Sequence, residues 1–408
     1  MTKIARNEYL ETLSDLRDKN LIKVITGARR VGKSTLLLQF QEKLKESQPD
    51  TSIISINLDV PEYRFLAEKN WKEIYDFIIQ AINPDKINYV FLDEIQNVVQ
   101  FEKLLEGLFV HPKIDLYVTG SNAYLLSSEL ATLLTGRAFE INVLPFSFSE
   151  YLKATGKTGN PDRAFSDFVK TGGFPEAVKL SEINSSYAYQ YLQTVYKNIY
   201  ENDIVPRYKI NSEQSYQEVV NFLCDCVGSP VSAGNIAKIL TNKGKKIDNK
   251  SVAKYISTLT DSYLFYCSTR FDIKGKQHLA TQEKYYIVDT GLRNALIGKE
   301  LTSDSGHLLE NVVYLELLRR KNQVWVGKID TNEVDFVVRD NNGYTKYIQV
   351  SQSVKNPETL ARELAPFDKI HDHNEKILIT ADYENGSWNG VKQVNIVDWL
   401  LKETILPS

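Results

Sequence analysis

The sequence predicts an α/β protein whose first 150 residues form a doubly wound, mainly parallel sheet. Two observations carry this prediction: a glycine-rich turn at 27–34 separates an apolar run from an amphipathic stretch, and a second apolar run at 89–92 ends in two acids. Alternating strands and helices of this kind form open sheets that hold ligands at the carboxyl ends of their strands. The strand candidates are 21–26, 52–58, 88–93, 114–119 and 139–143.

The glycine-rich turn matches the complete G-x-x-x-x-G-K-[ST] pattern of a phosphate-binding loop (P-loop) between a strand and a helix candidate. Its glycines let backbone N–H groups wrap a triphosphate, and the following helix N-terminus faces the anion. We expect Lys33 to reach the β- and γ-phosphates and Ser34 to ligate Mg²⁺. ATP and Mg²⁺ are thus the expected cofactors, and the residues expected to bind them are Gly27, Arg30, Val31, Gly32, Lys33, Ser34, Thr35 and Asp93.

Two acids, Asp93 and Glu94, emerge from the second buried strand. Asp93 is predicted to hold the Mg²⁺ shell together with Ser34, and Glu94 to activate the attacking water. A third strand candidate at 114–119 is followed by small polar residues, of which Asn122 would orient that water or touch the γ-phosphate. Asn122 also suits the N-cap of the next helix, and both roles can hold at once.

Composition sets limits on the class of protein. The 408 residues are 42% hydrophobic and 25% charged, which suits two or three globular domains. A formal net charge of −3 excludes a globally basic protein, so any nucleic-acid contact must use a local patch. Three cysteines without zinc-ligand spacing favour a reducing cytoplasm. The sequence contains neither a signal-peptide pattern nor a run of 18 apolar residues. It therefore predicts neither export nor a membrane span.

The pattern changes beyond residue 150. Residues 151–208 are predominantly helical with a break at 172–175, and residues 299–408 have α/β order. Between them, residues 209–298 show the order of a winged helix, in which three helices precede a two-stranded ribbon. The three helix candidates and two strand candidates are 213–227, 232–241, 249–261, 263–271 and 278–288.

The winged-helix candidate carries most of the positive charge. Between Pro230 and Lys284, ten lysines and arginines stand against four acids, a difference of six. Such local asymmetry is typical of a phosphate-binding surface, although a basic face used for a protein contact is the alternative. The residues predicted to contact DNA are Lys243, Lys245, Lys246, Lys250, Lys254, Lys274 and Lys276.

Together these residues resemble the prokaryotic AAA+-type P-loop ATPases of the MNS clan, a STAND-related group whose C-terminal domain was first catalogued as of unknown function. The resemblance covers nearly the whole chain. Its first two motifs are shared by many NTPases, but the ordered set is specific. The motifs lie at 27–34, 92–96, 119–122, 135–137, 144–151, 172–175, 286–292, 309–311 and 333–336.

The resemblance implies four domains: an ATPase core (1–150), a helical lid (151–208), a winged helix (209–298) and a restriction-endonuclease-like domain (299–408). Arg137 lies where AAA+ proteins carry an arginine finger that acts on the nucleotide of a neighbouring subunit. That role implies a homo-oligomeric ring, such as a hexamer; a structural arginine at a helix end is the alternative.

The last domain departs from an active nuclease. That fold normally offers a helix Glu, a strand Asp and a Glu-x-Lys strand, so that carboxylates bind metal and the lysine helps to activate water. Glu310 and Asp335 match, but Gln349 and Ser351 stand where Glu and Lys are needed. A neutral amide is a poor metal ligand. Lys355 is the lysine that could substitute, and we expect a degenerate site in a module that binds DNA or a partner.

The function expected from these features is that of an oligomeric, ATP-hydrolysing AAA+ protein that acts on DNA by remodelling, translocation or branched-DNA processing, as in repair or recombination. Two alternatives stay open. One is a STAND-type switch, in which ATP binding controls assembly and turnover is slow. The other is an ATP-dependent nuclease.

Overall fold

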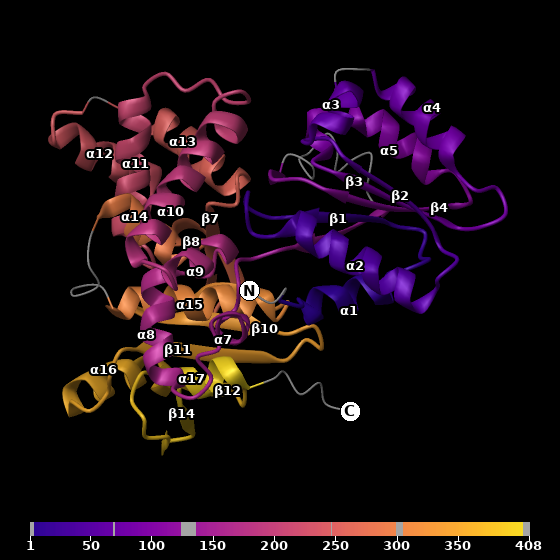
Figure 1. Cartoon of the computed structure of the whole chain (residues 1–408). Helices are drawn as coiled ribbons and strands as arrows, with labels where there is room; N and C mark the ends of the chain where they lie inside the picture. The colour runs from indigo at the N-terminus through magenta and orange to yellow at the C-terminus, as the bar shows by residue number, and fades with distance from the viewer. Residues whose placement is uncertain (1–3, 68–69, 124–135, 246, 299–304, 403–408) are drawn as a thin grey trace. The chain divides into compact units, whose positions relative to one another are not determined.

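The computed structural model divides the chain into two compact units. The N-terminal unit comprises residues 2–143 with 261–263, and the C-terminal unit comprises 144–260 with 264–408. The colours of Figure 1 run along the chain from indigo at the N-terminus to yellow at the C-terminus. The described residues are 4–67, 70–123, 136–245, 247–298 and 305–402.

The N-terminal unit is built on a parallel sheet. Its described strands have the order β2-β3-β4-β1-β5, and every neighbouring pair is parallel. This confirms the predicted α/β class and the doubly wound parallel sheet. The strands are β1 (Ile22–Thr26), β2 (Ser52–Asn57), β3 (Asn88–Asp93), β4 (Ile114–Thr119) and β5 (Ala138–Asn142).

Both faces of this sheet are covered by helices (Figure 1). Alternation along β3 explains why, because successive side chains of a strand point to opposite faces. Val90 and Leu92 belong to the core on one face, where Ile78 of α4 and Leu104 of α5 are also buried. Phe91 on the other face lies against Phe40 of α2, with the two ring centroids 6.3 Å apart. The helices are α1 (Asn7–Asp15), α2 (Lys33–Ser47), α3 (Pro61–Ala67), α4 (Trp71–Ala81) and α5 (Phe101–Phe109).

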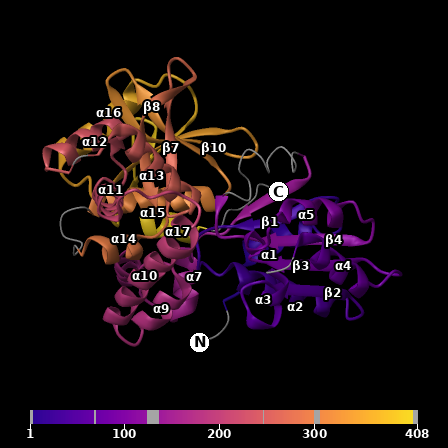
Figure 2. The ribbon, with the colours of Figure 1, turned by 90° about the horizontal axis from the view of Figure 1, so that it is seen from above.

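The C-terminal unit begins with a group of helices that pack on one another and on α14 (Figures 1 and 2). Ser147 forms a capping box with Glu150 at the start of the first helix, and proline occupies the first turn of the next two. The predicted break at 172–175 separates α8 from α9. The group consists of α7 (Phe148–Thr155), α8 (Pro161–Thr171), α9 (Pro175–Ser181), α10 (Ser185–Ile199) and the π-helical turn η3 (Tyr200–Ile204), with α14 at Thr290–Ile297.

Three helices and a β-ribbon follow in the order that the sequence predicts. The ribbon strands pair antiparallel, and a short strand, β6, pairs with the second of them. Ser232 caps α12 by accepting a hydrogen bond from the backbone N–H of Asn235. The elements are α11 (Glu213–Asp225), β6 (Pro230–Val231), α12 (Ala233–Asn242), α13 (Asn249–Asp261), β7 (Phe265–Asp272) and β8 (Gln277–Ile287).

The ribbon continues into the strands of the last hundred residues. β7 runs parallel to β9, so that Phe271 pairs with Gly327, and the described strands form one sheet in the order β13-β14-β12-β11-β10-β9-β7-β8-β6. The sequence pattern placed these strands in two domains, because pairing between distant segments leaves no trace in local periodicity; those domain boundaries stay a prediction. The remaining elements are α15 (Ser305–Arg319), β9 (Gln323–Ile329), β10 (Asn332–Arg339), β11 (Thr345–Ser351), α16 (Pro357–Asp368), β12 (Glu375–Thr380), β13 (Gly386–Trp388), β14 (Val391–Asn395) and α17 (Ile396–Leu401).

A buried carboxylate joins α14 to the break between α8 and α9. Asp289 accepts hydrogen bonds from the backbone N–H groups of Leu292 (2.8 Å) and Gly173 (2.6 Å). The backbones approach so closely that a Cβ on Gly291 would lie 1.9 Å from the carbonyl oxygen of Thr171. Burial raises the pKa of Asp289 to about 6, although the backbone N–H groups oppose the shift. Two motifs that are distant in sequence thus form one joint.

This joint makes the stability of the C-terminal unit depend on pH. The folded pKa of Asp289, about 6, exceeds the ordinary 3.8. The contribution of this carboxyl to the free energy of unfolding is therefore fully present below pH 3.8 and is lost as the pH rises through 6. From about pH 5 to about pH 7 we expect the unfolding free energy to fall by about 1 kcal/mol in the wild type relative to Asp289→Asn, since the amide stays neutral.

Chemical denaturation of both proteins at the two pH values measures this difference. Asp162→Asn, at a partly exposed position of α8, is the matched control and should run parallel to the wild type. An equal difference between wild type and Asp289→Asn at both pH values would contradict the expectation.

Candidate functional site

The P-loop folds into a tight concave turn between β1 and α2. Gly27, Arg30 and Gly32 all have positive φ (133°, 72° and 102°), a region that suits glycine but is strained for arginine. A Cβ on Gly27 would lie 2.3 Å from the carbonyl oxygen of Val143, so this position accepts only glycine. The buried Lys33 lies across the loop, with Nζ 3.0 Å and 3.1 Å from the carbonyl oxygens of Gly27 and Ala28.

The N-terminal helix supports this loop, which sequence reasoning missed. Arg6, next to α1, is 4% exposed and donates a hydrogen bond from Nη1 to the carbonyl oxygen of Val31 at 3.3 Å. Its guanidinium lies 4.8 Å from the ring centroid of Tyr9. The sequence carries no clear signal for this contact, because only the folded chain shows that Arg6 is buried.

The two predicted Mg²⁺ ligands, Ser34 and Asp93, are brought together by a hydrogen bond between their side chains. Asn57 of β2 donates from Nδ2 to Asp93 Oδ2 at 2.8 Å, and the hydroxyl of Thr119 in β4 donates to Asp93 Oδ1. Burial raises the pKa of Asp93, and the hydrogen bonds from Thr119 and Ser34 oppose the shift. A buried carboxylate beside a hydroxyl is a set of hard oxygen donors that fits Mg²⁺, which would compensate this charge.

Glu94 lies at the end of β3 in the left-handed region, with φ of 57°. Its backbone N–H donates to Thr119 Oγ1 at 2.9 Å. The carboxylate accepts a hydrogen bond from Nε2 of Gln96. Strain at a non-glycine residue is typical of functional positions, and here it places an acid beside Asp93.

Asn122 is buried just beyond the end of β4, on the edge of the sheet where Asp93 and Glu94 end β3. The structure therefore gathers Lys33, Ser34 and these two acids at one edge, with Asn122 beside them. The helix that Asn122 is predicted to cap falls on residues 124–135, which lie outside the described part of the chain. Its role stays a prediction.

Arg137 lies at the opposite edge of the same sheet. Its carbonyl oxygen accepts the N–H of Ile22, the first residue of β1, and its guanidinium is 5.8 Å from the ring centroid of Phe109. The side chain is exposed. Because the P-loop follows the last residue of β1, Arg137 does not reach the nucleotide site of its own subunit, and any catalytic role requires a neighbouring subunit.

Several of the lysines predicted to contact DNA already have partners within the folded chain. Lys245 pairs with Glu218 at 3.5 Å, and Nζ of Lys274 lies 2.7 Å and 2.8 Å from the two carboxylate oxygens of Asp330. Nζ of Lys254 donates to the carbonyl oxygen of Lys209 at 2.6 Å. The exposed lysines Lys243 after α12, Lys250 in α13 and Lys276 in the ribbon turn also belong to this surface, while Lys246 lies outside the described residues.

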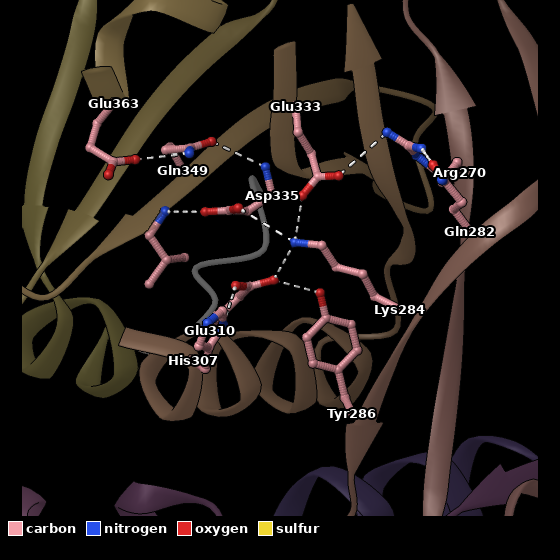
Figure 3. A network of polar contacts seen from close by, with 11 residues as sticks. Arg270, Gln282, Lys284, Tyr286, His307, Glu310, Glu333, Asp335, Gln349 and Glu363 are labelled. Carbon is pink, nitrogen blue, oxygen red and sulfur yellow. Dashed lines mark hydrogen bonds and ion pairs between the residues drawn. The ribbon is translucent and has the colours of Figure 1, made fainter. Parts of the chain in front are cut away.

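Lys284 belongs to the interior rather than to this surface (Figure 3). It is 2% exposed, and its Nζ lies 2.9 Å from Glu310 Oε1, 2.8 Å from Glu333 Oε1 and 3.7 Å from Asp335 Oδ1. Tyr286 adds a hydrogen bond from its hydroxyl to Glu310 at 2.7 Å. We call this cluster of Lys284, Glu310, Glu333 and Asp335 the acidic centre.

The structure brings the predicted nuclease-like residues Glu310, Asp335 and Gln349 together beside a pocket of about 600 Å³. Gln349 Oε1 accepts the backbone N–H of Asp335 at 3.1 Å, and its Nε2 donates to Glu363 at 2.9 Å. Lys355 is exposed and does not line the pocket. The lysine at this site is Lys284, which sequence reasoning counted as a surface charge.

The charges of the acidic centre compensate one another internally. Burial by itself would lower the pKa of Lys284, but the carboxylates of Glu310, Asp335 and Glu333 raise it above its ordinary value. Burial and the charge of Glu310 raise the pKa of Asp335, because one ammonium cannot offset three acids. In the described residues no group of three or more His, Cys, Asp or Glu is arranged to hold a metal ion.

Comparison with known proteins places the chain in a family. Residues 19–152 match a family described as an AAA domain, and residues 162–303 match a domain of unknown function. An uncharacterized protein of Haemophilus influenzae is 38% identical over 409 residues, which cover 98% of this chain and 99% of that protein. The chain belongs to the same family as this Haemophilus protein.

The AAA domain confirms the predicted AAA-type ATPase domain, since the match includes the P-loop and both acids. An uncharacterized protein of Methanocaldococcus jannaschii is 28% identical over 372 residues, covering 86% of this chain and 78% of that protein. The Walker-type ATPase of Pyrococcus abyssi is a similar solved structure, with 17% identity, a TM-score of 0.47 and coverage of 72% of this chain and 95% of that one. Among the described helices none is long and apolar enough to cross a membrane.

Lys284→Met should destabilise the protein by about 3–5 kcal/mol, because removal of one partner leaves buried acids without compensation. Urea denaturation measures the loss. Lys238→Met, at an exposed position of α12, should change stability little. Adding Glu310→Gln to Lys284→Met should restore part of the loss, and a double variant less stable than Lys284→Met would contradict the charge argument.

Proposed function

We propose that this protein binds ATP with Mg²⁺ and hydrolyses it, and that it uses this cycle as a homo-oligomer on DNA. The observation that carries the first part is the gathering of Ser34, Asp93 and Glu94 beside Lys33 at the carboxyl edge of the sheet. The AAA domain of residues 19–152 supports it. The free cysteines among the described residues support a reducing cytoplasm as its location.

Different residues would bind the metal ion, bind the phosphates and activate the water. Ser34 and Asp93 would hold Mg²⁺, which supplies positive charge to the phosphates when it is bound. We expect the ammonium of Lys33 to exchange the carbonyl oxygens of Gly27 and Ala28 for the β- and γ-phosphates, which the loop amides would also bind. Glu94 accepts a proton from the attacking water.

Two variants separate binding from chemistry. Lys33→Ala should weaken ATP binding about 10- to 100-fold, because it removes charge-assisted hydrogen bonds of about 1.5–3 kcal/mol. Glu94→Gln should bind ATP normally but release phosphate about 100- to 10,000-fold more slowly, since it lacks the base. Titration with a fluorescent ATP analogue and a phosphate-release assay measure the two effects.

Lys43→Ala is the control for the lysine, because Lys43 is exposed on α2 outside the loop. Unchanged nucleotide affinity in Lys33→Ala would refute the assignment of the P-loop, and normal turnover in Glu94→Gln would remove Glu94 from the role of base.

The proposed action on DNA is supported by exposed lysines that lie after α12, in α13 and in the ribbon turn. Lys243, Lys250 and Lys276 extend from elements whose order is that of a winged helix, and lysines that neutralise phosphates release counterions on binding. The proposed homo-oligomer, a ring in which Arg137 completes the site of the next subunit, is supported by the position of that exposed side chain far from its own P-loop edge.

Replacing Lys250 and Lys276 by Glu should weaken DNA binding and reduce its dependence on salt, by a slope of about one per lost phosphate contact. The measurement is fluorescence anisotropy with single-stranded, duplex and four-way DNA over a salt series. ATPase rate and oligomer mass are followed alongside. Lys43→Glu, a charge change on the AAA domain, should leave DNA binding unchanged.

Unchanged affinity of the double variant would contradict the DNA surface. ATP-triggered assembly without any effect of DNA on the ATPase rate would favour a nucleotide-dependent switch of STAND type instead.

A further inference from the structure

Gln96 lies two residues beyond Glu94, in the single-turn helix η1 (Ile95–Asn97). Two contacts fix this turn. Ile95 is fully buried in the core beneath α4 and α5, and the backbone N–H of Asn97 donates to the carbonyl oxygen of Glu94 at 3.1 Å. With Ile95 anchored inward, the side chain of Gln96 is held on the same side of the sheet edge as the two acids.

The chemistry of its neighbours fixes which way the Gln96 amide faces. Its Nε2 donates to the Glu94 carboxylate and lies 3.4 Å from Ser121 Oγ at the end of β4. An ionised carboxylate can only accept hydrogen bonds, so the opposite amide orientation would set oxygen against oxygen. The carbonyl oxygen Oε1 is therefore the amide atom that is not bonded to Glu94.

This carbonyl oxygen is buried and has no hydrogen-bond partner among the described residues. A buried acceptor left without a partner destabilises a fold by about 1–3 kcal/mol, and native structures contain few of them. Its position beside Glu94, the proposed base, indicates that the missing hydrogen-bond donor is a water molecule. A water molecule has two protons to donate, and two acceptors, Glu94 and Gln96, lie side by side at this point.

We propose that Gln96 positions the attacking water together with Glu94. This role presupposes the ATP hydrolysis proposed above and adds a residue to it. One proton of the water points to Glu94 and the other to Oε1 of Gln96, so a lone pair is left for the γ-phosphorus. The amide N–H of Gln96 also holds the Glu94 carboxylate in place.

The reaction is balanced without any further reactant. The water oxygen forms a bond to the γ-phosphorus, and the bond from that phosphorus to the oxygen bridging the β- and γ-phosphates breaks. The electron pair of the broken bond leaves with ADP, and one proton of the water passes to Glu94. Gln96 stays neutral throughout, so it is a positioning residue rather than a base.

Gln96→Leu keeps the volume of the side chain but removes both the acceptor and the donor. We expect kcat to fall about 10- to 100-fold, because a displaced water reacts at a fraction of its rate. KM and the affinity for a non-hydrolysable ATP analogue should stay within about threefold of the wild type, since Gln96 contacts no phosphate. Asn97→Ala, the exposed neighbour in η1, is the control and should keep the wild-type kcat.

A double-mutant cycle distinguishes positioning from simple support of the fold. If both residues act on one water, Gln96→Leu should lower kcat less than about twofold further in the Glu94→Gln background. If Gln96 only stabilises the turn, its effect should multiply with that of Glu94→Gln. Thermal unfolding of every variant is measured in parallel, and Gln96→Met replaces Gln96→Leu if the latter does not fold.

The outcomes separate the two proposals. A normal kcat in Gln96→Leu, or multiplicative effects in the cycle, would overturn the role of Gln96 while ATP hydrolysis itself stands. A wild type that does not hydrolyse ATP, or hydrolysis that survives Lys33→Ala unchanged, would overturn the proposed function instead.

Discussion

The nucleotide site depends on one hydroxyl group, that of Thr119. It donates a hydrogen bond to Asp93 and accepts one from the backbone N–H of Glu94, although both acids lie on the neighbouring strand. The first contact steadies a buried carboxylate, and the second holds Glu94 in the left-handed region that its backbone would otherwise avoid. A side chain at the last position of β4 thereby sets the geometry of the two acids proposed to hold Mg²⁺ and to activate water.

The parts of this site that are contiguous in the chain could be predicted from the sequence. Lys33 and Ser34 stand at fixed places in the P-loop pattern, and Asp93 and Glu94 end an apolar strand. The residues that hold them could not be predicted, because their contacts cross between strands. Asn57 reaches Asp93 from β2 over a separation of 36 residues, and nothing in the local pattern around it differs from an ordinary strand end.

Contacts between distant segments also explain why the sequence placed Lys284 among the surface charges. Lys284 stands in a basic stretch, and a lysine is mostly found on the surface. Its strand turns out to run beside the helix of Glu310, so that a charge counted toward DNA binding compensates buried acids instead. The order of helices and strands followed from periodicity, whereas the single sheet that joins the ribbon to the last domain depends on pairing between β7 and β9.

That pairing bears on how the C-terminal unit can transmit force. Phe271 of the ribbon pairs with Gly327, whose missing side chain admits Ile273 and Val337 at about 3.0 Å and 2.9 Å from the place a Cβ would take. The end of β7 is therefore paired with β9, and the ribbon is part of the sheet rather than a separate flap. A load on the turn of the ribbon would therefore pass into the sheet through β9 rather than through a flexible connection.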